Sequence, residues 1–101
     1  MLKFKRDSSA YNYVFEKKLS ANEEIILKIP DVSPNKKGIC DIGWQSDGNV
    51  TIYGTLSSDP ENSSALWQKI DENTDVNKTV SALKVINGSS VCNIAVRVIL
   101  N

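Results

Sequence analysis

The stretch ICDIGWQSDGNVTIYGTL, residues 39–56, decides the fold class of this chain. Apolar and polar side chains alternate on both sides of the pair Asp47-Gly48, and a period of two is typical of half-buried β-strands. Glycine accepts the positive φ of a tight turn, so the pattern predicts two strands joined as a hairpin. On the first strand Trp44 is in phase with Ile42, so we expect its ring in the core.

The same alternation recurs along the rest of the chain, and almost no segment has the 3.6-residue period of a helix. We expect a second hairpin turn at Asn87-Gly88 and a polar loop over residues 71–78. Strands are expected at residues 11–16, 24–29, 39–45, 50–56, 65–70, 79–87 and 91–100. Seven or eight strands at regular spacing predict an all-β fold, a single antiparallel β-sandwich of jelly-roll or immunoglobulin-like type. The last strand is mostly apolar, so it must lie at the centre of a sheet or be covered by another chain.

The chain divides into two unequal parts. Residues 1–10 predict a flexible N-terminal arm, and residues 11–101 hold the expected strands and predict one sandwich domain. A length of 101 residues supports one domain, because a second would need roughly 100 more residues to enclose its own core. The basic start has no apolar segment behind it, so we do not expect export through a signal peptide.

Charge and composition argue against several function classes. Twelve Lys and Arg balance twelve Asp and Glu, so no net charge draws the chain to nucleic acid or to an anionic membrane, and we expect neither as the main partner. The chain has no His, which is the commonest general base and metal ligand. The acidic run at residues 71–75 lacks the spacing of a calcium loop. We therefore expect a protein that is not an enzyme and needs no cofactor or metal.

The two cysteines, Cys40 and Cys92, leave two alternatives open, a disulfide or free thiols. We favour free thiols, because a chain made without an export signal is expected in a reducing compartment. The order Cys40, Trp44, Cys92 invites comparison with immunoglobulin domains. In that family, however, the Trp follows the first Cys by roughly a dozen residues or more, whereas here it follows by four.

Two groups of residues are candidates for contact with a partner. The arm places three cations around one aromatic ring, at Lys3, Phe4, Lys5 and Arg6. We expect these residues to dock on a neighbouring subunit, since three charges supply only a small, salt-sensitive attraction to nucleic acid. Tyr53 and Trp67 are the aromatic side chains that we expect to be partly exposed. They favour an alternative function, a carbohydrate-binding β-sandwich module on whose aromatic rings a glycan stacks.

From Trp44 onward, a little over half of the chain resembles small structural proteins of tailed bacteriophages. The resemblance is carried by WQSDGNVTIYGT at 44–55, ALW at 65–67, VNKT at 76–79 and the ending RVILN at 97–101. It implies a non-catalytic β-sandwich of the virion, made in the host cytoplasm, that decorates the capsid or belongs to the tail. It also implies a homo-oligomer, for example a trimer, that contacts a larger phage structural protein and grips its neighbours with an N-terminal arm.

Overall fold

The computed structural model describes residues 2–6, 12–29, 39–57, 59–62, 65–70 and 73–100, without the side chains of residues 39, 40 and 73–79. Within these ranges the protein is all-β, with ten strands and no helix. The strands are β1 (Leu2–Lys3), β2 (Lys5–Arg6), β3 (Asn12–Leu19), β4 (Glu24–Lys28), β5 (Ile39–Ser46), β6 (Val50–Thr55), β7 (Gln68–Ile70), β8 (Asn73–Thr79), β9 (Ala82–Asn87) and β10 (Cys92–Leu100).

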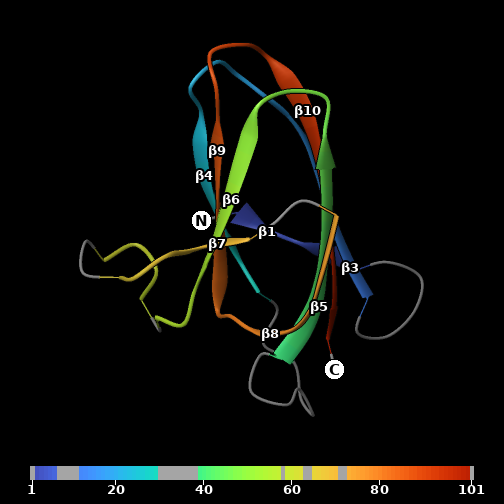
Figure 1. Ribbon diagram of the computed structural model, residues 1–101, viewed down its shortest axis with the longest axis vertical. Coiled ribbons are helices and arrows are strands. Elements are labelled where there is room, and N and C mark those ends of the chain that lie inside the picture. Colours follow the sequence, from blue (N-terminus) through green and yellow to red (C-terminus); the bar gives the residue numbers. More distant parts are fainter. Residues whose placement is uncertain are drawn as a thin grey trace.

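The strands form two five-stranded sheets. Sheet A has the order β1-β4-β9-β6-β7, and sheet B has the order β2-β3-β10-β5-β8. In Figure 1 the strands β4, β9 and β6 lie on the left and β10, β5 and β3 on the right. One hydrophobic core contains residues from both sheets. The prediction of an all-β protein is therefore confirmed.

The alternation read from the sequence selects the side chains of this core. On β10 every second residue is buried, and Ile42 and Trp44 of β5 are buried as predicted. The largest fully buried side chains come from both sheets: Leu19, Leu27, Ile42, Ile52, Leu83, Val85, Val96 and Val98. Strand β10 pairs with β3 along one side and with β5 along the other, so the apolar last strand lies at the centre of sheet B as expected.

Both predicted hairpins are wrong. Strands β5 and β6 lie in different sheets, and so do β9 and β10, so each tight turn carries the chain across the core. Neither Gly48 nor Gly88 has its φ in the left-handed region between +20° and +160°. Instead Gly48 is required by contact, since a Cβ there would lie 2.6 Å from the Cβ of Cys92. A turn sequence predicts that the chain reverses its direction. It does not predict which sheet the next strand joins.

The structure has ten strands where seven or eight were expected, and three further details of the strands differ from the prediction. The expected loop at residues 71–78 contains β8, a polar strand that pairs with β5 through its backbone at one edge of sheet B. The strand expected at residues 79–87 begins only at Ala82. The purely antiparallel prediction fails because β1 pairs with β4 in parallel. An edge strand needs few apolar side chains, and partners far apart in the chain are free to run in either direction.

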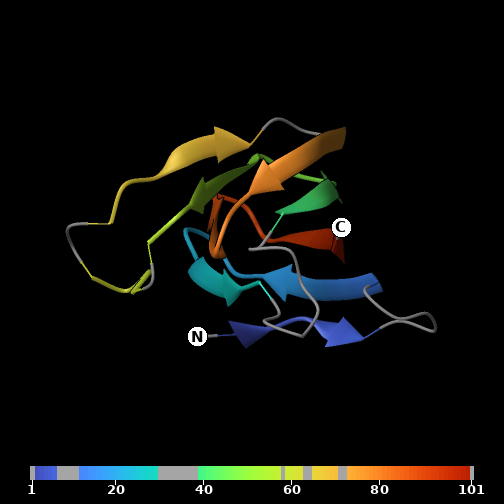
Figure 2. The same ribbon diagram turned by 90° about the horizontal axis from the view of Figure 1, so that it is seen from below.

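The N-terminal segment lies against the edges of both sheets. Leu2 and Lys3 pair with β4 of sheet A, and Lys5 and Arg6 pair with β3 of sheet B. Figure 2 shows β1 and β2 in dark blue along the outer side of the teal and light-blue strands. A flexible arm was the expectation for residues 1–10; residues 2–6 are paired, and residues 1 and 7–10 lie outside the described part of the chain.

The side chain of Asn87 connects the turns that cross between the sheets at one end of the molecule. Asn87 is 4% exposed, and its amide nitrogen donates to the carbonyl oxygens of Ser20 (2.8 Å) and Ser90 (2.9 Å). Its amide oxygen accepts from the thiol of Cys92 at 3.1 Å. The next residue, Gly88, donates its backbone N–H to the carbonyl of Asn49 at 3.0 Å. Residues 87 and 88 thus connect all three turns.

Replacing Asn87 by Ala removes the partner of two carbonyl groups and of one thiol. A buried polar group left without a partner costs about 1–3 kcal/mol, so we expect Asn87→Ala to lower the free energy of unfolding by about 2–4 kcal/mol. Urea denaturation followed by tryptophan fluorescence measures the change. The exposed Ser89→Ala in the same turn is the control, and an Asn87→Ala protein as stable as that control contradicts the role assigned to the network.

Candidate functional site

The predicted arm residues are divided between the surface and the core. Lys3, Lys5 and Arg6 are exposed. Phe4 is half-buried and packs against the core, and its ring meets the ring of Phe15 edge-on with centroids 6.3 Å apart. Phe4 therefore makes an internal contact that holds residues 2–6 to the sheets, and the three cations remain available on the surface.

If Phe4 fastens the N-terminal strands, its removal loosens them. Phe4→Ala deletes the edge-on pair with Phe15 and part of the apolar burial, and we expect a loss of about 1–2 kcal/mol of unfolding free energy because the ring is only half-buried. Thermal unfolding followed by circular dichroism measures it, with the exposed Lys5→Ala as the control. A Phe4→Ala protein with unchanged stability would mean that residues 2–6 behave as a free arm.

The structure brings Tyr53 and Trp67 to the same face. Tyr53 of β6 lies directly opposite Lys84 of β9 on the outer face of sheet A. The ammonium group of Lys84 lies 4.4 Å from the centroid of the Trp67 ring and 3.6 Å from Oε1 of Glu24. Both aromatic residues are half-buried. A cation at this distance is attracted to the face of the indole, so that face is occupied from within the molecule.

An apolar patch that the sequence analysis missed lies at the other end of sheet A from Asn87. Leu56 is 70% exposed and Leu66 is 84% exposed. Both line one recess, whose other lining residues are small, apolar or polar: Gly54, Thr55, Ser57, Ala65, Gln68 and Val80. We call Leu56, Leu66 and this recess the leucine patch. In the sequence, the patch is indicated by two leucines that flank a mostly polar loop. The fold shows in addition that these leucines line the same recess.

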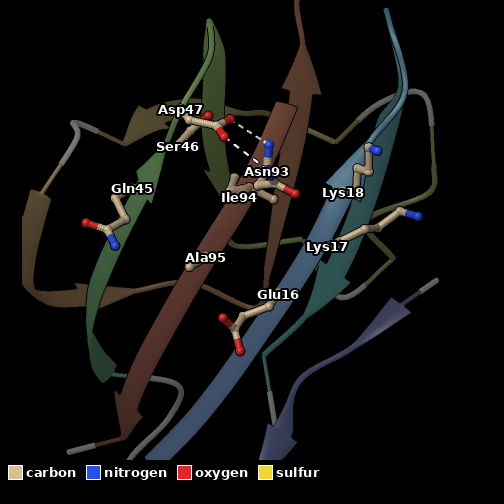
Figure 3. A pocket seen from close by; sticks show the side chains of 9 residues that line it. All are labelled: Glu16, Lys17, Lys18, Gln45, Ser46, Asp47, Asn93, Ile94 and Ala95. Atoms are coloured by element: carbon tan, nitrogen blue, oxygen red, sulfur yellow. Dashed lines mark hydrogen bonds between the residues drawn. The ribbon is translucent and has the colours of Figure 1, made fainter. Parts of the chain in front are cut away.

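A second unpredicted feature is a polar groove on the outer face of sheet B. Two neighbouring recesses share Glu16 of β3, Ala95 of β10 and Gln45 of β5. Figure 3 shows Glu16 and Gln45 on opposite sides of Ala95, with Asp47 and Asn93 further along the face. We call this surface the sheet B groove. The residues of the groove alternate with core residues along each strand, so the sequence predicts that they face outward. It does not predict which of them line the same recess.

One wall of the groove is fixed by two hydrogen bonds. The backbone N–H of Asn93 donates to Oδ1 of Asp47 at 2.7 Å, and the side-chain amide of Asn93 donates to Oδ2 at 3.0 Å. Both bonds lower the pKa of the Asp47 carboxyl below its ordinary value, because they stabilise the charged form. The bond from the backbone of Asn93 has the larger effect, and the bond from its side chain the smaller. Because Asp47 lies in the turn between β5 and β6, these bonds fasten that turn to β10.

The lowered pKa of Asp47 predicts a dependence of stability on pH. A carboxyl whose pKa is lower in the folded state stabilises the fold at any pH above its unfolded pKa of about 3.9, and this contribution is lost as the pH falls through the lowered value. We expect Asp47→Asn to have a lower melting temperature than the wild type at pH 7, and the difference to shrink toward pH 2. Melting curves at several pH values measure this, and a difference that stays constant contradicts it.

Within the described part of the chain, no group of three or more Cys, Asp or Glu side chains is arranged to hold a metal ion. Cys92 carries a free thiol that is buried. The favoured alternative, a free thiol, is therefore confirmed for Cys92, and the side chain of Cys40 lies outside the described part of the chain. None of the described residues belongs to a helix long and apolar enough to cross a membrane.

The chain matches no protein-family model, no curated protein and no solved structure. Its function is therefore inferred from its residues and their arrangement.

Proposed function

We propose that this chain is a non-catalytic structural protein of a phage virion, either a capsid-decoration protein or a tail component. It works through contacts between copies of itself, for example in a trimer, and with a larger structural protein. The observation that carries the proposal is the leucine patch, where Leu56 and Leu66 are 70% and 84% exposed beside one recess. Large apolar side chains exposed together are typical of a surface that another protein covers.

The strand order supports a jelly roll, the first of the two sandwich types expected. Sheet B contains β3-β10-β5-β8 and sheet A contains β4-β9-β6-β7. Every connection from β3 to β10 passes from one sheet to the other, except that between β6 and β7. This is the connectivity of two Greek keys rolled into a double sheet, an architecture that viral capsid proteins share with lectin domains. Because one architecture serves many functions, it supports the proposal without deciding it.

We further propose that Lys3, Lys5 and Arg6 contact a neighbouring subunit from a fixed position. Their strands lie along the edges of both sheets, and these side chains are exposed. Charged residues at the rim of an interface mainly steer the encounter, whereas buried apolar side chains supply most of the affinity. In this proposal the leucine patch holds the subunit in the assembly, and the three cations orient it.

The test replaces both leucines of the patch. We expect the wild type to form a trimer or larger ring in light scattering, and Leu56→Ser/Leu66→Ser to shift the mass toward the monomer, because polar side chains there no longer favour removal from water. The variant should keep its melting temperature, since both leucines are exposed. Val91→Ser is the matched control, because Val91 is 58% exposed beside the Asn87 end of the molecule.

Two outcomes would contradict the role of the patch. In one, the wild type and the double variant have the same oligomer mass at all concentrations, and the double variant enters assembled particles as well as the wild type does. In the other, Val91→Ser dissociates the oligomer and the double variant does not.

The position of Tyr53 and Trp67 favours a second candidate function, a carbohydrate-binding module that stacks a glycan on these two rings. Both lie on the outer face of sheet A near Lys84. Tyr53 is opposite Lys84 on the neighbouring strand, and the ammonium group of Lys84 lies over the Trp67 ring. The cation on the Trp67 ring weighs against this candidate, because a sugar ring would have to displace it from that face. We therefore rank it below the structural role.

A further inference from the structure

The sheet B groove has a small residue, Ala95, at its floor, surrounded by longer polar side chains. Ala95 pairs with Glu16 on one side and with Gln45 on the other, so all three side chains share a row across the sheet. Strands lie about 4.8 Å apart, which places the two walls about 10 Å apart across a methyl group. In the next row, Gly43 of β5 leaves the floor open beside Arg97. The groove is thus a slot about as wide as one sugar ring with its hydroxyl groups.

Two longer side chains of β10 stand at the ends of the groove. Asn93 and Arg97 lie on the same face of β10 as Ala95, one on each side of it along the strand. They are four residues apart, about 14 Å along the strand, so the floor at Ala95 holds one sugar ring. Beyond that ring, Gly43 beside Arg97 leaves room for a chain-like ligand to continue over β5.

The chemistry of the walls suits hydroxyl groups. Gln45 and Asn93 each offer a donor and an acceptor in one plane, Glu16 offers two acceptor oxygens, and the Arg97 guanidinium offers donors. A sugar hydroxyl both donates and accepts, and neighbouring hydroxyls match such planar pairs. Alternating donors and acceptors along one surface therefore complement a polyhydroxylated ligand better than an apolar one.

The charges of the groove favour a neutral ligand. The cation Lys18 lies beside Asn93 and the cation Arg97 beside Gly43, whereas Glu16 and Asp47 are carboxylates of the same face, and the carboxylate of Asp47 accepts two hydrogen bonds from Asn93. Negative carboxylates and positive cations line the same surface, so neither sign of charge dominates it. A surface of mixed sign does not attract phosphate or nucleic acid in the way that a basic surface does.

Two wall residues are already held in place. Asn93 is fixed by Asp47, and Nη1 of Arg97 donates to Oδ1 of Asn12 at 2.8 Å. Side chains that are ordered before binding lose less conformational entropy when a ligand arrives. We propose that the sheet B groove binds a neutral oligosaccharide, with one sugar ring over Ala95 between Glu16 and Gln45 and between Asn93 and Arg97. This site is distinct from the leucine patch and from the Tyr53 and Trp67 face.

The experiment is a titration of the full chain, labelled with ¹⁵N, with maltohexaose, cellohexaose, xylohexaose and chitotetraose, each followed by NMR. We expect at least one of these sugars to shift the amide signals of residues 16, 45 and 95. Gln45→Ala should weaken that binding about 10-fold, as expected for the loss of one wall of hydrogen bonds. Ala95→Leu should abolish binding, because its side chain fills the floor. Trp67→Ala is the control and should bind as the wild type does.

Three results would overturn the proposal. The first is that none of the four sugars shifts any signal. The second is that the shifts centre on Tyr53 and Trp67, and that Trp67→Ala loses binding while Gln45→Ala keeps it. The third is that the groove signals shift with protein concentration alone, which would show that a second copy covers this face. Leu56→Ser/Leu66→Ser should keep its sugar binding, so the assembly proposal and this one fail independently.

Discussion

The structure depends on the hydrogen-bonded contact among three turns at one end of the molecule. Each of these turns carries the chain from one sheet to the other, so the strands they join cannot hydrogen-bond to each other as a hairpin would. The side chain of Asn87 and the backbone of Gly88 supply the missing connection by bonding to the neighbouring turns. A network of this kind is buried, so it stabilises only when every member has its partner.

This arrangement leaves the outer faces of the two sheets with different surfaces. On sheet A, half-buried aromatic rings gather around Lys84, and the leucine patch lies beyond them. On sheet B, small side chains at Ala95 and Gly43 lie between polar ones and make a shallow groove. An apolar patch is suited to a protein partner and a polar groove to a hydroxylated ligand. Because the two surfaces lie on different sheets, occupation of one leaves the other open.

The N-terminal segment illustrates how one residue changes the meaning of a motif. The sequence predicts that Lys3, Phe4, Lys5 and Arg6 belong to a flexible arm. Phe4 instead packs on Phe15, and short strands on either side of it pair with both sheets. The apolar ring gains more from burial against the core than from exposure on an arm. Its neighbours are therefore presented as part of a rigid surface.

The order of residues along the chain is enough to predict the class of the fold, the inward face of most strands, the burial of Trp44 and the central place of the last strand. Each of these follows from side-chain alternation or from the exclusion of apolar residues from an edge, which are properties of short segments. Long-range pairing of strands, in contrast, sets three other features: the turns at Gly48 and Gly88 cross between the sheets, β8 is a strand, and β1 runs parallel to β4. It also produces the leucine patch and the sheet B groove. These features depend on which distant strands become neighbours, and local periodicity carries no record of that choice.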